Sequence, residues 1–445
     1  MFVPKLERMM GIEVYATKSL GIGGIIRQSV EDFVVEEMLV DCSKAKIAKS
    51  AEQRQVLGSS AVKDKYLLCV LVKRNWDTFQ AVRAVAEQMG INTWQIQIAG
   101  IKDAKAVTAQ HITVEGVSAE DIQKVHLKDV EIRSVGYFRN KLSPYYLLGN
   151  NFTITINAIN HSKSTIKKRI TKTIQELKTL GGVPNFFGHQ RFGTTRLITH
   201  LVGKAMVKGN FKKAAMLFLA KPSRHEHPES RQAREELRAT HDFQHALKIF
   251  PKQLRYERLM LRYLADKPDD FVGAFRRLPV KLRQLFPQAY QAYLFNKFLS
   301  RRIARGLPLD RAKVGDYVVN VERSGLPMLA MQKIASAETL KEINKAIEKG
   351  KMRLAIPLIG FRQRPSLGIQ GEIEKQILEE ESITPENFKI KAIPEIASRG
   401  EPRTAITPLN NFSLKETSHD SANPSKCKAK ISFMLYRGCY ATIIL

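Results

Sequence analysis

The first 160 residues alternate short runs of β-branched, apolar and aromatic residues with clusters of turn residues. Runs of this length and composition predict strands. A helical pattern over 76–89 follows Asn75, the expected N-cap, and stops at Gly90. The alternation predicts an α/β or α+β unit. The strands are expected at 24–28, 33–40, 66–73, 107–115, 131–138 and 151–159.

The pattern changes after residue 162, where a helix is expected over 164–180 and helical periodicity continues to about residue 305. This change predicts a second domain. The segment 43–65, rich in Lys, Ser, Ala and Gln, predicts either a basic loop or a poorly packed helix. Further elements are expected as a polar loop at 222–230, helices over 231–264 and 287–305, and strands at 315–320, 353–357, 430–435 and 440–445.

Composition narrows the function classes. At 445 residues the chain is long enough for about two to four domains. Its 44% hydrophobic and 26% charged residues exclude wholesale disorder. The formal net charge of +29 favours a polyanionic partner such as a nucleic acid, although a generally basic, solvated surface would give the same excess.

Membrane insertion and export are not expected. No apolar stretch approaches the ~20 residues needed to span a bilayer, and the segment Met1 to Met10 lacks the apolar core of a signal peptide. Four cysteines lie far apart without a C-x-x-C pair, which argues against a disulfide framework and a thiolate zinc site. The expected location is the reducing cytoplasm.

The segment QIQIAGIKDAKAVTAQ holds the first candidate for chemistry. Asp103 follows an apolar strand and Gly100, and it stands between Lys102 and Lys105. Ammonium groups near a carboxylate favour its ionised form, which can act as a nucleophile or base. A solvated surface turn gives the same K-D-x-K spacing and is the more frequent occurrence.

The segment GVPNFFGHQRFG at 182–193 concentrates aromatic, Gly and polar residues. Phe rings and Arg planes stack on unpaired bases, and Gly lets the backbone approach a phosphate. Phe187, Gln190 and Arg191 are therefore candidates for RNA contact. The alternative is a loop at a domain junction with a small aromatic cluster.

Four histidines raise the question of a metal site. His241 and His245 have the i, i+4 spacing of a helical metal site, and His225 and His227 precede them among several acidic residues. Polar helices often carry such residues facing water, and this interpretation is favoured over a metal site.

Six separated motifs occur in order along the chain. They are Arg27 with EDFVVEE at 31–37, AGIKD at 99–103, LGNNF at 148–152, GVPNFFGHQRFG at 182–193, AYQAYLFN at 289–296 and GCYAT at 438–442. Together they resemble the motifs of the tRNA pseudouridine synthase D (TruD) family, and in particular of its archaeal members. The resemblance extends over nearly the whole chain.

The resemblance implies an α/β (α+β) fold: a pseudouridine synthase core with a curved mixed or antiparallel sheet and helices, plus an inserted family-specific (TRUD) domain. The implied domains are 1–183 for the N-terminal part of the catalytic domain, 184–394 for the insertion, and 395–445 for C-terminal strands that return to the catalytic domain.

The implied activity is isomerisation of uridine in tRNA, usually uridine 13, to pseudouridine. Asp103 matches the catalytic aspartate, and Lys102 and Arg27 match positions lining the site. Asn150 and Phe152 match the pair that orients the aspartate and stacks on the target base. The reaction needs neither metal nor cofactor, and tRNA is the expected partner, without an obligate protein partner.

Departures from the family pattern are small: His189 stands at a position that is often acidic, and Arg27 replaces a frequent Lys. Ala292 and Cys439 each replace a common Ser. Attack on the ribose, addition to the uracil ring and removal of a sugar proton all remain open for Asp103. A catalytically silent RNA-binding protein and a metal-dependent nuclease are the alternative functions.

Overall fold

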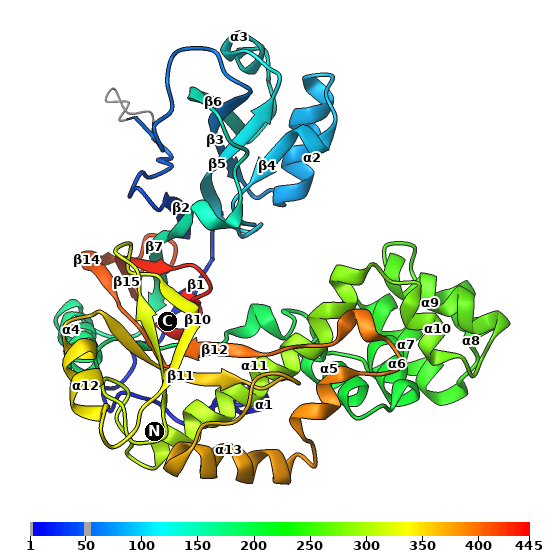
Figure 1. The fold of residues 1–445 in the computed structure, drawn as a ribbon. Helices are drawn as coiled ribbons and strands as arrows, with labels where there is room; N and C mark the ends of the chain where they lie inside the picture. The colour runs from blue at the N-terminus through cyan, green and yellow to red at the C-terminus, as the bar shows by residue number, and fades with distance from the viewer. Residues whose placement is uncertain (1–2, 49–54) are drawn as a thin grey trace. The chain divides into compact units, whose positions relative to one another are not determined.

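The computed structural model describes residues 3–48 and 55–445, and the chain divides into two compact units. The sheet unit comprises Thr17–Gly182 and Thr407–Ala441, and the helix-rich unit comprises Met1–Ala16, Val183–Ile406 and Thr442–Leu445 (Figure 1). Each unit is therefore built from separated chain segments. The domain limits expected at 183/184 and 394/395 stay predictions.

The sheet unit is organised around a mixed sheet with the strand order β14-β15-β7-β2-β5-β3-β6, in which β1 also pairs with β7 and β4 with β5. The pairing of β2 with β5 is parallel, and the other pairings are antiparallel. This arrangement confirms the expected α+β class. Its strands are β1 (Ile25–Ile26), β2 (Phe33–Leu39), β3 (Tyr66–Arg74), β4 (Ile96–Ile98), β5 (Val107–Glu115), β6 (Val130–Phe138), β7 (Leu147–Ile159), β14 (Asn410–His419) and β15 (Cys427–Tyr436). Its helices are α2 (Thr78–Gln88), α3 (Ala119–Gln123) and α4 (Lys163–Thr179), with 3-10 turns η1 (Val30–Asp32), η2 (Thr93–Gln95) and η3 (Pro144–Tyr146).

Helix α2 covers part of this sheet. Its apolar face, which includes Ala81 and Val85, packs on buried residues of β3 and β5 such as Cys69 and Ile112. The prediction that Asn75 caps the helix is wrong. The cap is Asp77, whose carboxylate accepts hydrogen bonds from the N–H groups of the second and third helical residues, a geometry that Asn75 lies too far upstream to provide.

The predicted basic segment 43–65 is described only in part, because residues 49–54 lie outside the described residues. The described remainder contains no helix. It is not merely a solvated loop, since Ala45 is fully buried and packs against Val70 and Val72 of β3.

The helix-rich unit gathers α5–α10 on one side, and the long helix α11 runs from them toward a small sheet of order β10-β9-β11-β12 (Figure 1). Its helices are α1 (Lys5–Met9), α5 (Thr199–Val207), α6 (Phe211–Ala220), α7 (Pro228–Thr240), α8 (Phe243–Ile249), α9 (Arg255–Asp266), α10 (Phe271–Arg276), α11 (Val280–Ala304), α12 (Leu340–Glu348) and α13 (Gly368–Glu380). Its strands are β8 (Val183–Pro184), β9 (Tyr317–Val321), β10 (Pro327–Ile334), β11 (Met352–Leu358) and β12 (Glu401–Thr404), followed by β13 (Ile406–Thr407) at the boundary. The 3-10 turns are η4 (His189–Arg191), η5 (Pro385–Lys389), η6 (Pro394–Ile396) and η7 (Ala441–Ile443).

Helix α11 starts seven residues before its predicted start at Pro287. Proline lacks an N–H donor and normally marks a helix start, but here it lies inside the helix, where α5 packs closely on it. Gly203 of α5 makes this approach possible: a Cβ there would lie 1.9 Å from the Phe286 carbonyl oxygen. Tertiary packing therefore overrides the local signal.

Two other sequence expectations are corrected. The helical region predicted over 231–264 is divided among three helices. His241, in a left-handed conformation with φ of 56°, ends α7, and an extended Phe250 ends α8 before α9 begins at Arg255. The strand predicted over 440–445 is instead the 3-10 turn η7. Within the described residues, no helix combines the length and apolar character needed to cross a membrane.

Candidate active site

The carboxylate of Asp103 is held by an arginine. Asp103 lies in the loop between β4 and β5, and its Oδ1 accepts a hydrogen bond of 2.7 Å from Nη2 of Arg27. The Asp103 and Arg27 side chains are 30% and 27% exposed, respectively. Because both remain partly exposed, a substrate can approach the carboxylate.

Arg27 is itself positioned by two features. Its guanidinium carbon lies 3.9 Å from the centre of the buried Phe33 ring, a cation–π contact that fixes the plane of the group. Its backbone φ is 60°, in the left-handed region that residues other than glycine rarely adopt. A strained backbone maintained at this position is typical of a functional site.

Lys73, the penultimate residue of β3, holds the backbone of the Asp103 loop in place. Its buried ammonium group donates hydrogen bonds of 2.7 Å to the carbonyl oxygens of Asp103 and Trp76. Burial lowers the pKa of Lys73 to about 8, although the charge of Asp103 acts in the opposite direction. Lys73 therefore fixes the loop through its carbonyl groups and leaves the Asp103 carboxylate to Arg27.

Lys102 does not serve the Asp103 carboxylate as the sequence suggested. Its buried ammonium group extends to Glu37 of β2, 2.5 Å from Oε2. Glu37 is fully buried, and its Oε1 accepts a hydrogen bond of 3.0 Å from the backbone N–H of His111. Burial acts to raise the pKa of Glu37, but Lys102 and His111 outweigh it and hold the pKa below its usual value. The pair thus ties the residue next to Asp103 to the centre of the sheet.

Asn150 and Phe152 lie on β7 beside this pair. In the antiparallel β2–β7 register, Asn150 is opposite Glu37 and Phe152 is opposite Val35, so these side chains share one sheet face. Asn150 Oδ1 is buried without a hydrogen-bond partner among the described residues. Buried acceptors without a partner are rare in folded proteins, which makes Asn150 a candidate for a polar ligand.

The Phe152 ring belongs to an aromatic row. Its centre lies 6.1 Å from that of Phe33, the ring on which the Arg27 guanidinium stacks, and 5.5 Å from that of Phe433 on β15. Only 6% of Phe152 is exposed, so most of its ring is already covered by protein. All five site residues predicted from the sequence lie in the sheet unit, namely Asp103, Arg27, Lys102, Asn150 and Phe152.

The loop 182–193 belongs mainly to the helix-rich unit, and its three Phe rings are buried. Phe187 packs edge-on against Phe295 at 5.6 Å and lies under the guanidinium of Arg403 at 3.9 Å. Arg191 donates a hydrogen bond of 3.3 Å to Gln288, whereas Gln190 is exposed. The structure gives the Phe rings a packing role, and contact of this loop with RNA stays a prediction.

The four candidate metal-binding histidines do not share one helix. His241 ends α7, and His245 lies in α8, where its Nε2 is 2.6 Å from Glu236. The His225 ring accepts a hydrogen bond of 3.2 Å from Arg224, and His227 is 3.8 Å from Glu229. The part of the chain that the structure describes contains no group of three or more metal-ligating side chains.

Comparison with known proteins identifies the family. The family model of tRNA pseudouridine synthase D (TruD) matches residues 9–445. The chain belongs to the tRNA pseudouridine synthase D family. A relative of that name from Methanosarcina barkeri is 40% identical over 100% of this chain and 97% of its own length, and one from Pyrococcus abyssi is 35% identical over 97% of each chain. A crystal structure described as TruD from Methanosarcina mazei, 38% identical, matches 100% of this chain and 97% of its own with a TM-score of 0.84.

Membership in the tRNA pseudouridine synthase D family makes the chain a pseudouridine synthase, an RNA-modifying isomerase. Two residues that position the candidate site, Lys73 and Glu37, were assigned no role from the sequence. Lys73 ends the apolar run YLLCVLVK. Glu37 continues the alternation of Phe33 and Val35 and therefore lies on the buried face of β2. A charged residue at a position where periodicity predicts burial was the available signal.

Proposed function

We propose that this pseudouridine synthase acts on tRNA in the cytoplasm, with uridine 13 as its target and the Asp103 carboxylate as the group that reacts with the substrate. The observation that carries the assignment is the partly exposed Arg27–Asp103 pair, anchored from below by Lys73 and by the Lys102–Glu37 pair.

The chemistry fits one carboxylate. The bond between C1′ and N1 of uridine breaks, the uracil turns, and a bond between C1′ and C5 forms. C5 loses a proton and N1 gains one, so the reaction is balanced without a redox partner or hydrolysis. Arg27 keeps the Asp103 carboxylate oriented, and the second oxygen remains available to the substrate.

The surrounding side chains suit a base removed from its stack. Asn150 Oδ1 offers an acceptor for the uracil N3–H, and the aromatic row that contains Phe152 forms one apolar wall. The two ion pairs hold these groups in place before the substrate arrives, which lowers the cost of ordering them during the reaction.

The test is Asp103→Asn, which keeps the size of the side chain but removes its negative charge. Pseudouridine formation on an unmodified tRNA transcript should fall by more than about a thousandfold. Binding of tRNA should persist or tighten slightly, because one repulsion toward phosphate is removed. Mass spectrometry of digested tRNA measures the product, and filter binding measures affinity.

Asp64→Asn is the matched control, since Asp64 is an exposed aspartate of the sheet unit. It should retain wild-type turnover. If Asp103→Asn formed pseudouridine at the control's rate, the assignment of Asp103 would be wrong. Product at a uridine other than position 13 would overturn the proposed target alone.

A further inference from the structure

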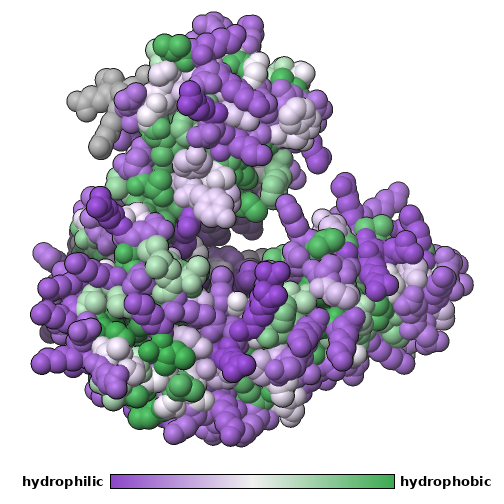
Figure 2. Space-filling view, viewed as in Figure 1, coloured by the Kyte–Doolittle hydropathy of each residue, from purple (hydrophilic) through white to green (hydrophobic). Residues whose placement is uncertain are grey.

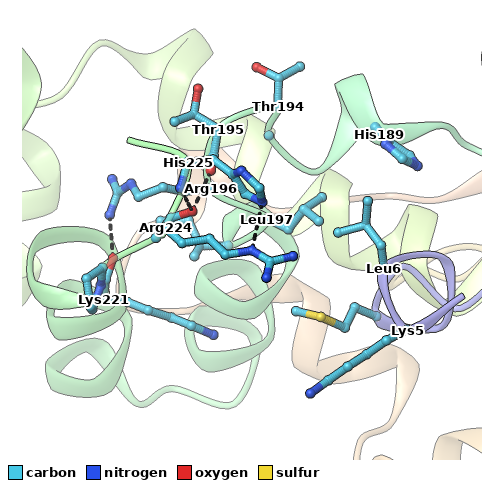
Figure 3. A pocket seen from close by; sticks show the side chains of 15 residues that line it. Lys5, Leu6, His189, Thr194, Thr195, Arg196, Leu197, Lys221, Arg224 and His225 are labelled. Carbon is cyan, nitrogen blue, oxygen red and sulfur yellow. Dashed lines mark hydrogen bonds between the residues drawn. The ribbon is translucent and has the colours of Figure 1, made fainter. Parts of the chain in front are cut away.

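The helix-rich unit contains a cavity that the proposed reaction does not use. Its volume is about 660 Å³, and α1, the turn after η4 and the loop between α6 and α7 line it (Figure 3). The lining includes five basic side chains besides Arg196, namely Lys5, His189, Lys221, Arg224 and His225. Among the described residues that line the cavity, none is Asp or Glu.

Arg196 has a structural role. Its guanidinium donates hydrogen bonds to the carbonyl oxygens of Phe218 and Lys221 and to Glu257. In Figure 3 the Arg196 guanidinium turns away from the cavity, toward the backbone carbonyl of Lys221. The charged ends of the Lys5, Lys221 and Arg224 side chains extend around the cavity. His189 is held by Glu7 at 2.7 Å. The positive charge available to a ligand therefore comes from Lys5, Lys221 and Arg224.

Lys221 shows the effect of this charge imbalance. Burial and then the nearby charge of Arg238 lower its pKa. An ammonium group in such surroundings gains stability when an anion arrives, because the anion compensates for both effects.

Two further hollows share lining residues with the cavity or with each other. A second, of about 480 Å³, shares Lys221 and adds Lys213, Arg238 and His241 to the lining. A third, of about 590 Å³, shares Lys213 and adds Lys208, together with Lys204, whose ammonium group is already 2.6 Å from Glu381. The cations that this hollow offers to a ligand are therefore Lys208 and Lys213. As in the first, no acidic residue of the described chain lines either one. Hydrophilic side chains also predominate over the neighbouring helices on the face drawn in Figure 2.

We propose that these three hollows form a phosphate-binding track for the backbone of the RNA substrate, with the cavity around Lys5, Lys221 and Arg224 as its principal site. This inference rests on the proposed function for the identity of the RNA. Each hollow contributes lysine or arginine side chains, so that several phosphates of one backbone can each meet a cation. The contacts would hold the substrate without reading its bases.

An acidic peptide is the competing ligand. A phosphodiester offers a regular series of charges along a stiff backbone, whereas glutamate side chains are flexible and their charges are irregularly spaced. A series of separate hollows matches the regular series better. The net charge of +29 and membership in an RNA-modifying family favour the same choice.

The test is the triple variant Lys5→Ala/Lys221→Ala/Arg224→Ala, assayed with an unmodified tRNA transcript. The Kd should rise about tenfold or more, and the slope of log Kd against log salt should fall by about 2 to 3, roughly one for each phosphate that no longer meets a cation. The value of kcat at saturating tRNA should stay unchanged, because none of the three residues belongs to the Asp103 site.

The matched control is Lys341→Ala/Lys345→Ala/Lys349→Ala, which removes the same charge from the same unit. Lys341 and Lys345 are exposed residues of α12, and Lys349 is its exposed C-cap. It should leave the salt slope near the wild-type value. Equal effects of the two triple variants would show that only total charge matters and would overturn the track.

Three further outcomes are informative. If the cavity variant melts at a lower temperature, the milder Lys5→Gln/Arg224→Gln variant takes its place, with the same expected direction of change. Poly-glutamate of matched charge is the competing probe. If it bound the wild-type protein as tightly as tRNA does, and if its affinity for the triple variant fell as much as that of tRNA, the site would be one for acidic peptides. A wild-type protein that binds tRNA through this cavity but makes no pseudouridine would refute the proposed function and leave the track intact.

Discussion

The Asp103 site of the sheet unit and the basic cavity of the helix-rich unit use positive charge in opposite ways. At the Asp103 site, Arg27 and Lys102 each have a carboxylate partner. At the cavity, Lys5, Lys221 and Arg224 line a space whose described wall has no carboxylate. Paired cations orient groups and add little net attraction for a polyanion, whereas cations without acidic neighbours attract phosphate over a distance set by ionic strength.

This difference teaches that positive charge in a sequence is not one signal. Both regions contribute to the basic composition. Only the three-dimensional surroundings distinguish a lysine that is paired with a carboxylate and holds a neighbouring residue in place from a lysine that is free to bind a ligand. A mutation at the first kind should change turnover, and a mutation at the second kind should change affinity.

Lys73→Met should give the largest of the effects that sharpen this contrast. Without the ammonium group, the carbonyl oxygens of Asp103 and Trp76 lose their donor and the loop shifts. A displacement of about 1 Å at a reacting group can lower kcat about a hundredfold. The Kd for tRNA should stay near the wild-type value, which filter binding checks.

The pH dependence separates this positioning role from a merely structural one. The pKa of Lys73 is lowered to about 8, so its charge is lost as pH rises through that value and kcat of the wild type should decline there. The variant should lack this limb. Between about pH 8 and 10.5 the unfolded chain binds more protons at this group, so its contribution to stability rises with pH even as activity declines. A variant with the wild-type pH profile would refute the role.

Phe152→Leu should have a smaller effect of the same kind. Stacking on one base contributes about 1 to 3 kcal/mol. Only 6% of Phe152 is exposed, so we expect the lower end of this range, with kcat falling about tenfold while the Kd for whole tRNA changes little. Leucine is preferable to alanine, because removing a buried Phe costs about 3 to 5 kcal/mol of stability. Phe412→Leu is the control, since this ring stacks on Phe433 at 6.5 Å, one ring further along the row. Equal losses of kcat and affinity would move Phe152 from the base pocket to the general RNA surface.

Chelation should have the smallest effect. Carboxylates at the Asp103 site are engaged by cations, and the proposed chemistry uses no metal. Protein dialysed against EDTA and assayed with tRNA refolded in monovalent salt should keep kcat within about twofold. Loss of activity that stoichiometric zinc restores would instead revive a metal role for His225, His227, His241 or His245.

The sequence predicted the parts of the fold that local pattern determines. Strand β2 alternates buried and half-buried residues, and β3 is an almost purely apolar run, so both kinds of strand were recognisable. Strand β5 is buried although it mixes apolar and polar residues, and its β-branched residues marked it as a strand. Pro287 misled because its helix is stabilised by close packing at Gly203, which lies far away in the sequence.

The candidate site was predictable in its residues more than in its contacts. The family motifs pointed to Asp103 and Arg27, but proximity along the chain suggested Lys102 as the partner of Asp103. Successive residues of an extended loop point in different directions, so Lys102 turns inward to Glu37. The basic cavity was not predictable as a unit. Only His189 and Gly193 of its lining belong to the segment 182–193, whereas its three available cations come from α1 and from the loop between α6 and α7.

The division of the sheet unit has a consequence for synthesis on the ribosome. Strand β7, which carries Asn150 and Phe152, pairs along one edge with β15, and Phe433 lies opposite Phe152. Until β15 emerges, that edge of β7 has unpaired backbone groups and its aromatic row lacks a member. The nascent chain must therefore remain protected from wrong pairing while the whole helix-rich segment is translated. A truncated product ending before β15 would retain Asp103 yet lack the completed sheet around it, so we expect such a chain to be inactive on RNA.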